Sequence, residues 1–193
     1  MITKQVPLLA TVVVAAAAAI MIALGFWQLG RSEEKAALIA RYEAATGNPA
    51  AVAFPFREDA VAAALYRRSQ VVCDAVLSVA AGNGIRADGA KGWAHRAVCR
   101  TAQGQEATIA LGFSNNAQSP GWRGGTVRGI VAPGPRLVAD PPLAGLQPLA
   151  KPDPSDLPNN HLAYAVQWFL FAATALVIYV LALRRREAHG QRT

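Results

Sequence analysis

The sequence predicts a membrane protein in which two transmembrane α-helices flank an exterior α+β domain with a mainly antiparallel sheet. Two apolar runs without a charged residue carry this prediction, one between Lys4 and Arg31 and the other from Leu162 to Leu183. Each run exceeds or matches the roughly 20 apolar residues that cross a bilayer as a helix. The segment between them contains short stretches in which apolar and polar residues alternate, the pattern typical of half-buried strands.

The first run, "QVPLLATVVVAAAAAIMIALGFWQLG", predicts a transmembrane helix over residues 6–29. A cleavable signal peptide is the alternative, because Ala23, Leu24 and Gly25 resemble a small-residue cleavage site. We favour the membrane helix, since the run is much longer than the roughly 7–15 apolar residues of a signal sequence. The following "RSEEKAALIARYEAATG" keeps helical spacing as far as Gly47, so we expect the helix to continue outside the membrane.

The second run predicts a transmembrane helix over residues 161–183, followed by a tail (184–193) with four arginines and one glutamate. Positive charge next to a membrane helix marks the cytoplasmic side. We therefore expect a multi-pass protein of the bacterial inner membrane, with residues 1–5 and 184–193 cytoplasmic and residues 30–160 in the periplasm. Part of the net charge of +7 then serves membrane orientation, and no nucleic acid partner is expected.

The exterior segment opens with a predicted short helix in "REDAVAAALYRR" and continues with a predicted pair of antiparallel strands. The first strand, "SQVVCDAVLSV", is expected to turn one face inward, formed by Val71, Cys73, Ala75, Leu77 and Val79. A Gly-rich break, "AAGNGIRADGAKG", separates it from "WAHRAVCRT". The second strand is expected to turn inward Trp93, His95, Ala97 and Cys99.

Two further strands are predicted in "EATIALGF" and "WRGGTVRGIVA". The Pro-rich "PGPRLVADPPLAGLQPLAKPDPSDLP" is predicted to be a connector that returns the chain to the membrane. With roughly 100 residues, the exterior part is large enough for a single core.

Cys73 and Cys99 are the two cysteines of the chain. A hairpin centred between them would bring them nearly opposite each other, which permits a disulfide in an oxidising periplasm. Two small buried apolar side chains are the alternative. His95 is expected to be packed or hydrogen-bonded inside the domain.

Catalysis finds little support in the sequence. It has no nucleophile elbow, phosphate loop, dinucleotide fingerprint or paired-carboxylate arrangement. We therefore expect a protein that is not an enzyme.

Polar and aromatic residues gather at the exterior ends of both predicted membrane helices. Trp27 and Arg31 lie four residues apart on one helix face, and His161, Tyr164 and Trp168 share a face of the other. An interfacial aromatic belt with a snorkelling arginine explains part of this pattern. An ionisable residue that begins a membrane helix instead favours a functional role. A neutral imidazole is an ordinary axial ligand of haem iron, and Arg31 could then pair with a haem propionate.

The same two ends carry a family resemblance. "GFWQLGRSEEKAALI" and "NNHLAYAVQWF" resemble the terminal motifs of the Surfeit locus protein one family, membrane-bound assembly factors of cytochrome c oxidase. "YRRSQVV" and "GWAHRAVCR" loosely match the central region of that family. One departure is "LGFSNNAQSPGW", which lacks the arginine of the family's Arg-Gly-Trp pattern.

The resemblance implies a protein that helps to mature the catalytic subunit of an A-type haem-copper oxidase. For bacterial members it implies haem a binding through His161, with Trp27, Gln28 and Arg31 in the functional region. The expected cofactor is haem a, with Tyr164 and Trp168 as pocket walls. The expected partners are subunit I of cytochrome c oxidase, haem a synthase and membrane lipid.

Two other functions remain open from the sequence. The chain could be a haem-free scaffold that stabilises an oxidase assembly intermediate. It could also handle thiols or copper in the periplasm through Cys73 and Cys99.

Overall fold

The structure is a computed structural model and describes residues 7–189. The predicted cytoplasmic N-terminus (1–5) and the last part of the basic tail (190–193) lie outside the described residues. The chain forms two compact units, one built from the chain up to Leu38 together with the chain from Pro158 onward, and the other from Ile39–Leu157.

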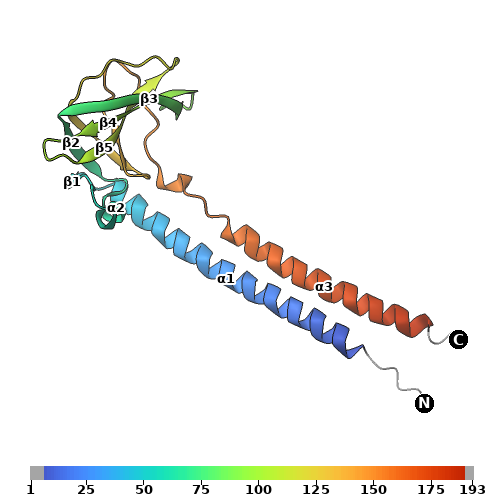
Figure 1. The fold of residues 1–193 in the computed structure, drawn as a ribbon. Coiled ribbons are helices and arrows are strands. Elements are labelled where there is room, and N and C mark those ends of the chain that lie inside the picture. The colour runs from blue at the N-terminus through green and yellow to red at the C-terminus, as the bar shows by residue number, and fades with distance from the viewer. Residues whose placement is uncertain (1–6, 190–193) are drawn as a thin grey trace. The chain divides into compact units, whose positions relative to one another are not determined.

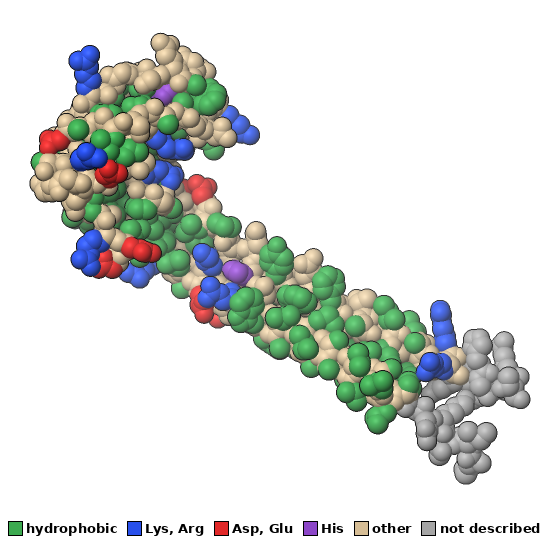
Figure 2. All heavy atoms as spheres, viewed as in Figure 1, with side chains coloured by type: hydrophobic (Ala, Val, Ile, Leu, Met, Phe, Trp, Pro, Cys, Tyr) green, Lys and Arg blue, Asp and Glu red, His purple; other side chains and the backbone are tan. Residues whose placement is uncertain are grey.

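The first unit contains α3 (His161–His189) and most of α1 (Leu8–Thr46), which run side by side (Figure 1). The end of α1, from Ile39 onward, belongs to the second unit. Helix α1 is continuous from the predicted membrane segment to its predicted end, because neither glycine nor proline follows between Gly30 and Gly47. Both helices are long and apolar enough to span a membrane, and an 18-residue stretch within each has a mean hydropathy of 2.6 and 2.2, respectively. Hydrophobic side chains cover most of their visible surface (Figure 2), which fits a membrane protein.

The second unit is built on a seven-stranded sheet. It contains β1 (Val52–Ala53), the short helix α2 (Glu58–Ala64), β2 (Arg68–Cys73), β3 (Ala75–Ile85), β4 (Lys91–Arg100), β5 (Glu106–Ser114), β6 (Gly125–Ala132), β7 (Arg136–Ala139) and a 3-10 turn, η1 (Pro154–Asp156). The strand order is β1-β2-β6-β7-β5-β4-β3. Only β1 with β2 and β5 with β7 pair in parallel. The predicted fold class, two apolar helices flanking a domain with a mainly antiparallel sheet, is confirmed.

The sheet curls around its core, since the consecutive strands β2 and β3 lie far apart in its order. Strands β2 and β3 are separated in the chain by Asp74 alone, yet β3 is at one edge and β2 lies near the other. The backbone N–H of Asp74 donates to the carbonyl of Arg100, 3.0 Å away, which holds this corner against β4.

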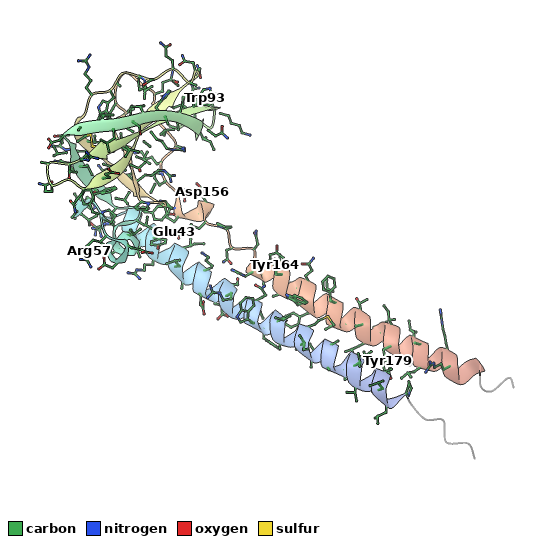
Figure 3. All side chains as sticks on the ribbon, viewed as in Figure 1. Glu43, Arg57, Trp93, Asp156, Tyr164 and Tyr179 are labelled. Carbon is green, nitrogen blue, oxygen red and sulfur yellow. A yellow bond between two sulfur atoms is a disulfide. The ribbon has the colours of Figure 1, made fainter. Side chains whose placement is uncertain are left out.

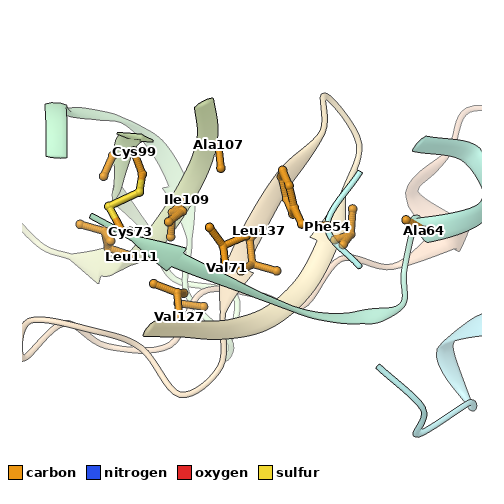
Figure 4. Packing of buried hydrophobic residues seen from close by; sticks show 13 residues of the cluster. Phe54, Ala64, Val71, Cys73, Cys99, Ala107, Ile109, Leu111, Val127 and Leu137 are labelled. Atoms are coloured by element: carbon orange, nitrogen blue, oxygen red, sulfur yellow. A yellow bond between two sulfur atoms is a disulfide. The ribbon is translucent and has the colours of Figure 1, made fainter. Parts of the chain in front are cut away.

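The inner face of the curled sheet forms the core (Figure 4). Alternation along β2 buries Ser69, Val71 and Cys73, and Ile109 and Leu111 of β5 are fully buried beside them. Cys73 and Cys99 are joined by a disulfide, with 5.5 Å between their Cα atoms. The bridge links β2 to β4 across the core, whereas the residue directly opposite Cys99 in the adjacent strand is Val76.

The predicted first strand of the hairpin is wrong in one respect. "SQVVCDAVLSV" is not one strand, because the chain turns at Asp74 and an irregularity between Val76 and Ser78 shifts the alternation. Leu77, predicted to face inward, is therefore 41% exposed. Trp93 of the second strand is also 37% exposed, although His95, Ala97 and Cys99 are buried as predicted.

The sequence pattern also predicted two loops, the Gly-rich segment and the Pro-rich connector, where the structure contains strands. The Gly-rich segment continues β3 as far as Ile85, and the hairpin turn lies at 86–90 instead. The Pro-rich connector contains β7, which pairs with β5 on one side and β6 on the other. Strand β7 has four residues, which are too few to produce a clear periodicity, and Pro-Gly and Pro-Pro sequences flank it. Strand β1, of two residues, was missed for the same reason.

Candidate functional site

The two long helices pack closely because small residues line their contact. Ala18 of α1 and Ala165 and Ala172 of α3 are buried, at 4%, 0% and 2% exposure. Gly25 has no side chain where an added Cβ would meet the ring of Phe169 at 2.5 Å. Small residues of this kind let membrane helices approach each other, since no hydrophobic effect drives their association in lipid.

The helices are antiparallel, as two hydrogen bonds at opposite ends of the pair show. The hydroxyl oxygens of Thr11 and Tyr179 are 2.5 Å apart near one end, and Tyr179 is labelled in Figure 3. At the other end the amide Nδ2 of Asn159 donates to the carbonyl oxygen of Ser32 at 3.2 Å. The register between these two points brings residue 28 of α1 opposite residue 161 of α3.

His161 and Gln28 meet at this position. The Nδ1 atom of His161 lies 2.7 Å from the carbonyl oxygen Oε1 of Gln28. A carbonyl oxygen can only accept a hydrogen bond, so this contact requires the tautomer in which Nδ1 is the donor. A neutral imidazole with its proton on Nδ1 has a lone pair on Nε2, which can bind a metal ion.

Arg31 lies one turn beyond Gln28 on α1 and forms an ion pair with Glu34. The two side chains are 46% and 65% exposed. An exposed pair of this kind contributes about 0–1 kcal/mol, so the guanidinium can exchange its partner at little cost. Glu34 was not singled out from the sequence as a partner of this arginine.

The aromatic residues of the predicted site do not close a pocket. Trp27 and Tyr164 are 57% and 52% exposed. Trp168 is half-buried and packs edge-on against Phe171, with 6.2 Å between ring centroids. The predicted site residues thus lie at the same end of the helix pair, and among them His161 and Gln28 form a hydrogen bond from one helix to the other.

Asn159 is a site residue that sequence reasoning missed. Its Nδ2 bonds across to α1, and its Oδ1 is buried without a hydrogen-bond partner among residues 7–189. The signal was present, since two asparagines stand directly before His161 in "NNHLAYAVQWF". A buried polar atom without a partner is costly unless a ligand or water completes it.

The cysteines and the remaining histidine of the second unit do not form a comparable site. Cys73 and Cys99 are bridged and buried in the core. His95 is fully buried, and its Nε2 lies 2.8 Å from the hydroxyl of Ser114. Within the described residues, no group of three or more histidine, cysteine or acidic side chains could hold a metal ion.

Comparison with known proteins gives one family. The model of the SURF1 family matches residues 15–173, most of the chain, including the end of the helix pair that carries Gln28 and His161. Members of this family are cytochrome oxidase assembly factors and are not known as enzymes. No curated protein matches the chain.

Proposed function

Because the chain belongs to the SURF1 family, we propose that it is an assembly factor of cytochrome c oxidase that binds haem a and assists its insertion into subunit I. The observation that carries the haem proposal is the hydrogen bond from His161 Nδ1 to Gln28 Oε1. It supports ligation because it leaves the Nε2 lone pair free and fixes the orientation of the ring.

The other residues at this end of the helices suit the periphery of a haem. Trp27, Tyr164 and Trp168 offer apolar ring faces, and Arg31 offers a cation for a propionate once it leaves Glu34. Haem a would supply the iron centre that the oxidase needs. The chain itself would bind the macrocycle, orient the imidazole through Gln28 and hold the site at the membrane boundary.

The proposed setting is the bacterial inner membrane. The arginines at 184–186 follow the apolar part of α3, which supports a cytoplasmic position for that end. Both termini would then be cytoplasmic and the sheet domain periplasmic. Haem a synthase is the proposed source of the cofactor and subunit I its destination. No reaction is assigned to the chain.

The test is an optical spectrum with pyridine-haemochrome analysis of the full chain purified from a membrane that makes haem a. We expect a haem a signal that is lost in His161→Ala and retained in His189→Ala, a change at the other end of the same helix. Gln28→Leu should weaken haem binding by about 10–100-fold, as loss of a partner to a ligating histidine does. Gln118→Leu, at an exposed position of the second unit, is the matched control.

Retention of haem by His161→Ala would show that the ligand assignment is wrong. A colourless protein from such a membrane that still co-purifies with oxidase subunits would favour the haem-free scaffold. The thiol or copper function has less support, because both cysteines are bridged and at most 3% exposed.

A further inference from the structure

The second unit has a pocket on the outer face of its sheet, away from the core. Its volume is about 650 Å³, within the range of roughly 300–1,000 Å³ typical of small-molecule sites. We propose that this pocket binds a small organic molecule that carries a phosphate or carboxylate group on an apolar body. This inference is independent of the haem proposal, since all lining residues belong to the second unit.

The floor of the pocket follows from the register of three adjacent strands. Arg96 of β4 pairs with Ala110 of β5, and Ala110 pairs with Val138 of β7, so the three lie in a row. Their chain neighbours Ala97 and Leu137 are buried in the core. Side chains alternate between the faces of a strand, so the row lies on the outer face.

Small residues keep this face hollow. Gly84 of β3 pairs with Gly92 of β4, and Gly82 pairs with Ala94. An added Cβ on Gly82 would lie 2.9 Å from Nη1 of Arg96. The absence of a side chain at Gly82 thus leaves the space that the guanidinium of Arg96 occupies.

The connector forms the opposite wall. Its residue Leu149 packs onto the apolar floor and forms an isolated bridge with Arg86 at the end of β3. The backbone N–H of Ala150 donates to the carbonyl of Ile85 at 2.9 Å. These two contacts attach the connector to the end of β3, which borders the pocket. They also place the apolar side chain of Leu149 over Ala110 and Val138 of the floor.

The charges of the lining favour an anion. Four cations and one carboxylate line it: Lys91, Arg96, Arg136, Lys151 and Asp156. Asp156 lies on η1 (Figure 3). The ammonium of Lys151 is 3.2 Å from the carboxylate of Asp140, so its charge is already matched.

Arg96 and Arg136 have no such match within residues 7–189. The described ion pairs include neither of them, and each donates one hydrogen bond to a backbone carbonyl, of Asn83 and Pro133 respectively. Burial lowers the pKa of Arg136, and the positive charge of Arg96 lowers it further. An anion between them would relieve this repulsion, and the unused N–H groups suit the oxygens of a phosphate or carboxylate.

The test is calorimetric titration of the full chain in an uncharged detergent with three probes: phenyl phosphate, inorganic phosphate and benzyl alcohol. We expect phenyl phosphate to bind at least about tenfold more tightly than either partial probe, because only it meets both the guanidinium groups and the apolar floor. Inorganic phosphate binding as tightly as phenyl phosphate would overturn the apolar part of the proposal. Absence of phenyl phosphate binding would overturn all of it.

Substitutions locate the binding. Arg96→Gln and Arg136→Gln should each raise the Kd for phenyl phosphate by about tenfold. Arg100→Gln, on the same strand but outside the pocket, is the matched control. Urea midpoints show whether each variant is folded, and folded Arg96→Gln and Arg136→Gln proteins with unchanged Kd would refute the site. Haem content should be the same in all three variants, which separates this test from that of His161.

Discussion

Removing the disulfide should lower the stability of the second unit, the sheet domain, and leave the stability of the helix pair unchanged. The bridge joins cysteines 26 residues apart in the sequence. For a loop of that length the chain-entropy relation gives about 3.5 kcal/mol of stabilisation, through the restriction of the unfolded chain. Both cysteines belong to the core cluster. The double Cys73→Ala, Cys99→Ala variant should therefore lose this amount plus a smaller packing contribution from the two sulfur atoms.

The assay is urea unfolding of the full chain in detergent, followed by tryptophan fluorescence. Trp122 is partly buried against the core cluster, so its emission reports on the sheet domain. Reduced wild-type protein is the control, because it lacks the cross-link but keeps both sulfur atoms in place. We expect reduction to account for most of the loss seen in the double variant.

Two results would refute this reasoning. Equal urea midpoints for the oxidised and reduced protein would show that the bridge does not restrict the unfolded chain as the relation requires. A double variant that is folded and binds haem but no longer supports oxidase maturation would show that the cysteines act chemically. A purely structural bridge predicts that the folded variant supports maturation.

Two further predictions concern single positions. Gly25→Ala should destabilise the helix pair by about 1–3 kcal/mol, because the new methyl group overlaps the ring of Phe169; Gly30→Ala, which meets nothing within 4 Å, should not, and thermal unfolding followed by circular dichroism compares them. A hydrogen bond from Arg86 lowers the pKa of Asp88 to about 2. The ionised Asp88 therefore contributes its full stabilisation of the fold above the unfolded pKa of about 4, and this contribution is lost as the pH falls towards 2. The Asp88→Asn variant should therefore be less stable than wild type at neutral pH and equally stable near pH 2. Urea midpoints that differ by the same amount at both pH values would contradict this account.

The helices could be predicted because their signal is local. An uncharged run such as the one before Arg31 needs no partner to be identified, since the cost of placing a charge in lipid applies to each residue separately. The inward positions of Val71, Ala97 and Cys99 followed from alternation for the same reason. The prediction failed at Asp74, where the chain leaves one strand for another in a different part of the sheet. Alternation cannot reveal that change, because it records only which face a residue occupies.

For the candidate site, helical spacing predicted that His161, Tyr164 and Trp168 share one face of the second helix. It also predicted that Trp27 and Arg31 share one face of the first helix. The bond between His161 and Gln28 joins two residues 133 positions apart in the chain, so it depends on the register between the two helices. That register is decided by packing, through residues such as Gly25 and Phe169.

The outer pocket depends on tertiary structure even more. Arg96 and Arg136 come from strands that are separated in the sheet by β5, and the second of these strands was not visible in the sequence. Hydropathy and alternation are properties of neighbouring residues, so the sequence alone decides that two long apolar helices flank a β-rich domain in the chain. Which side chains meet across helices and strands is decided by long-range packing, and both proposed binding sites arise at that level.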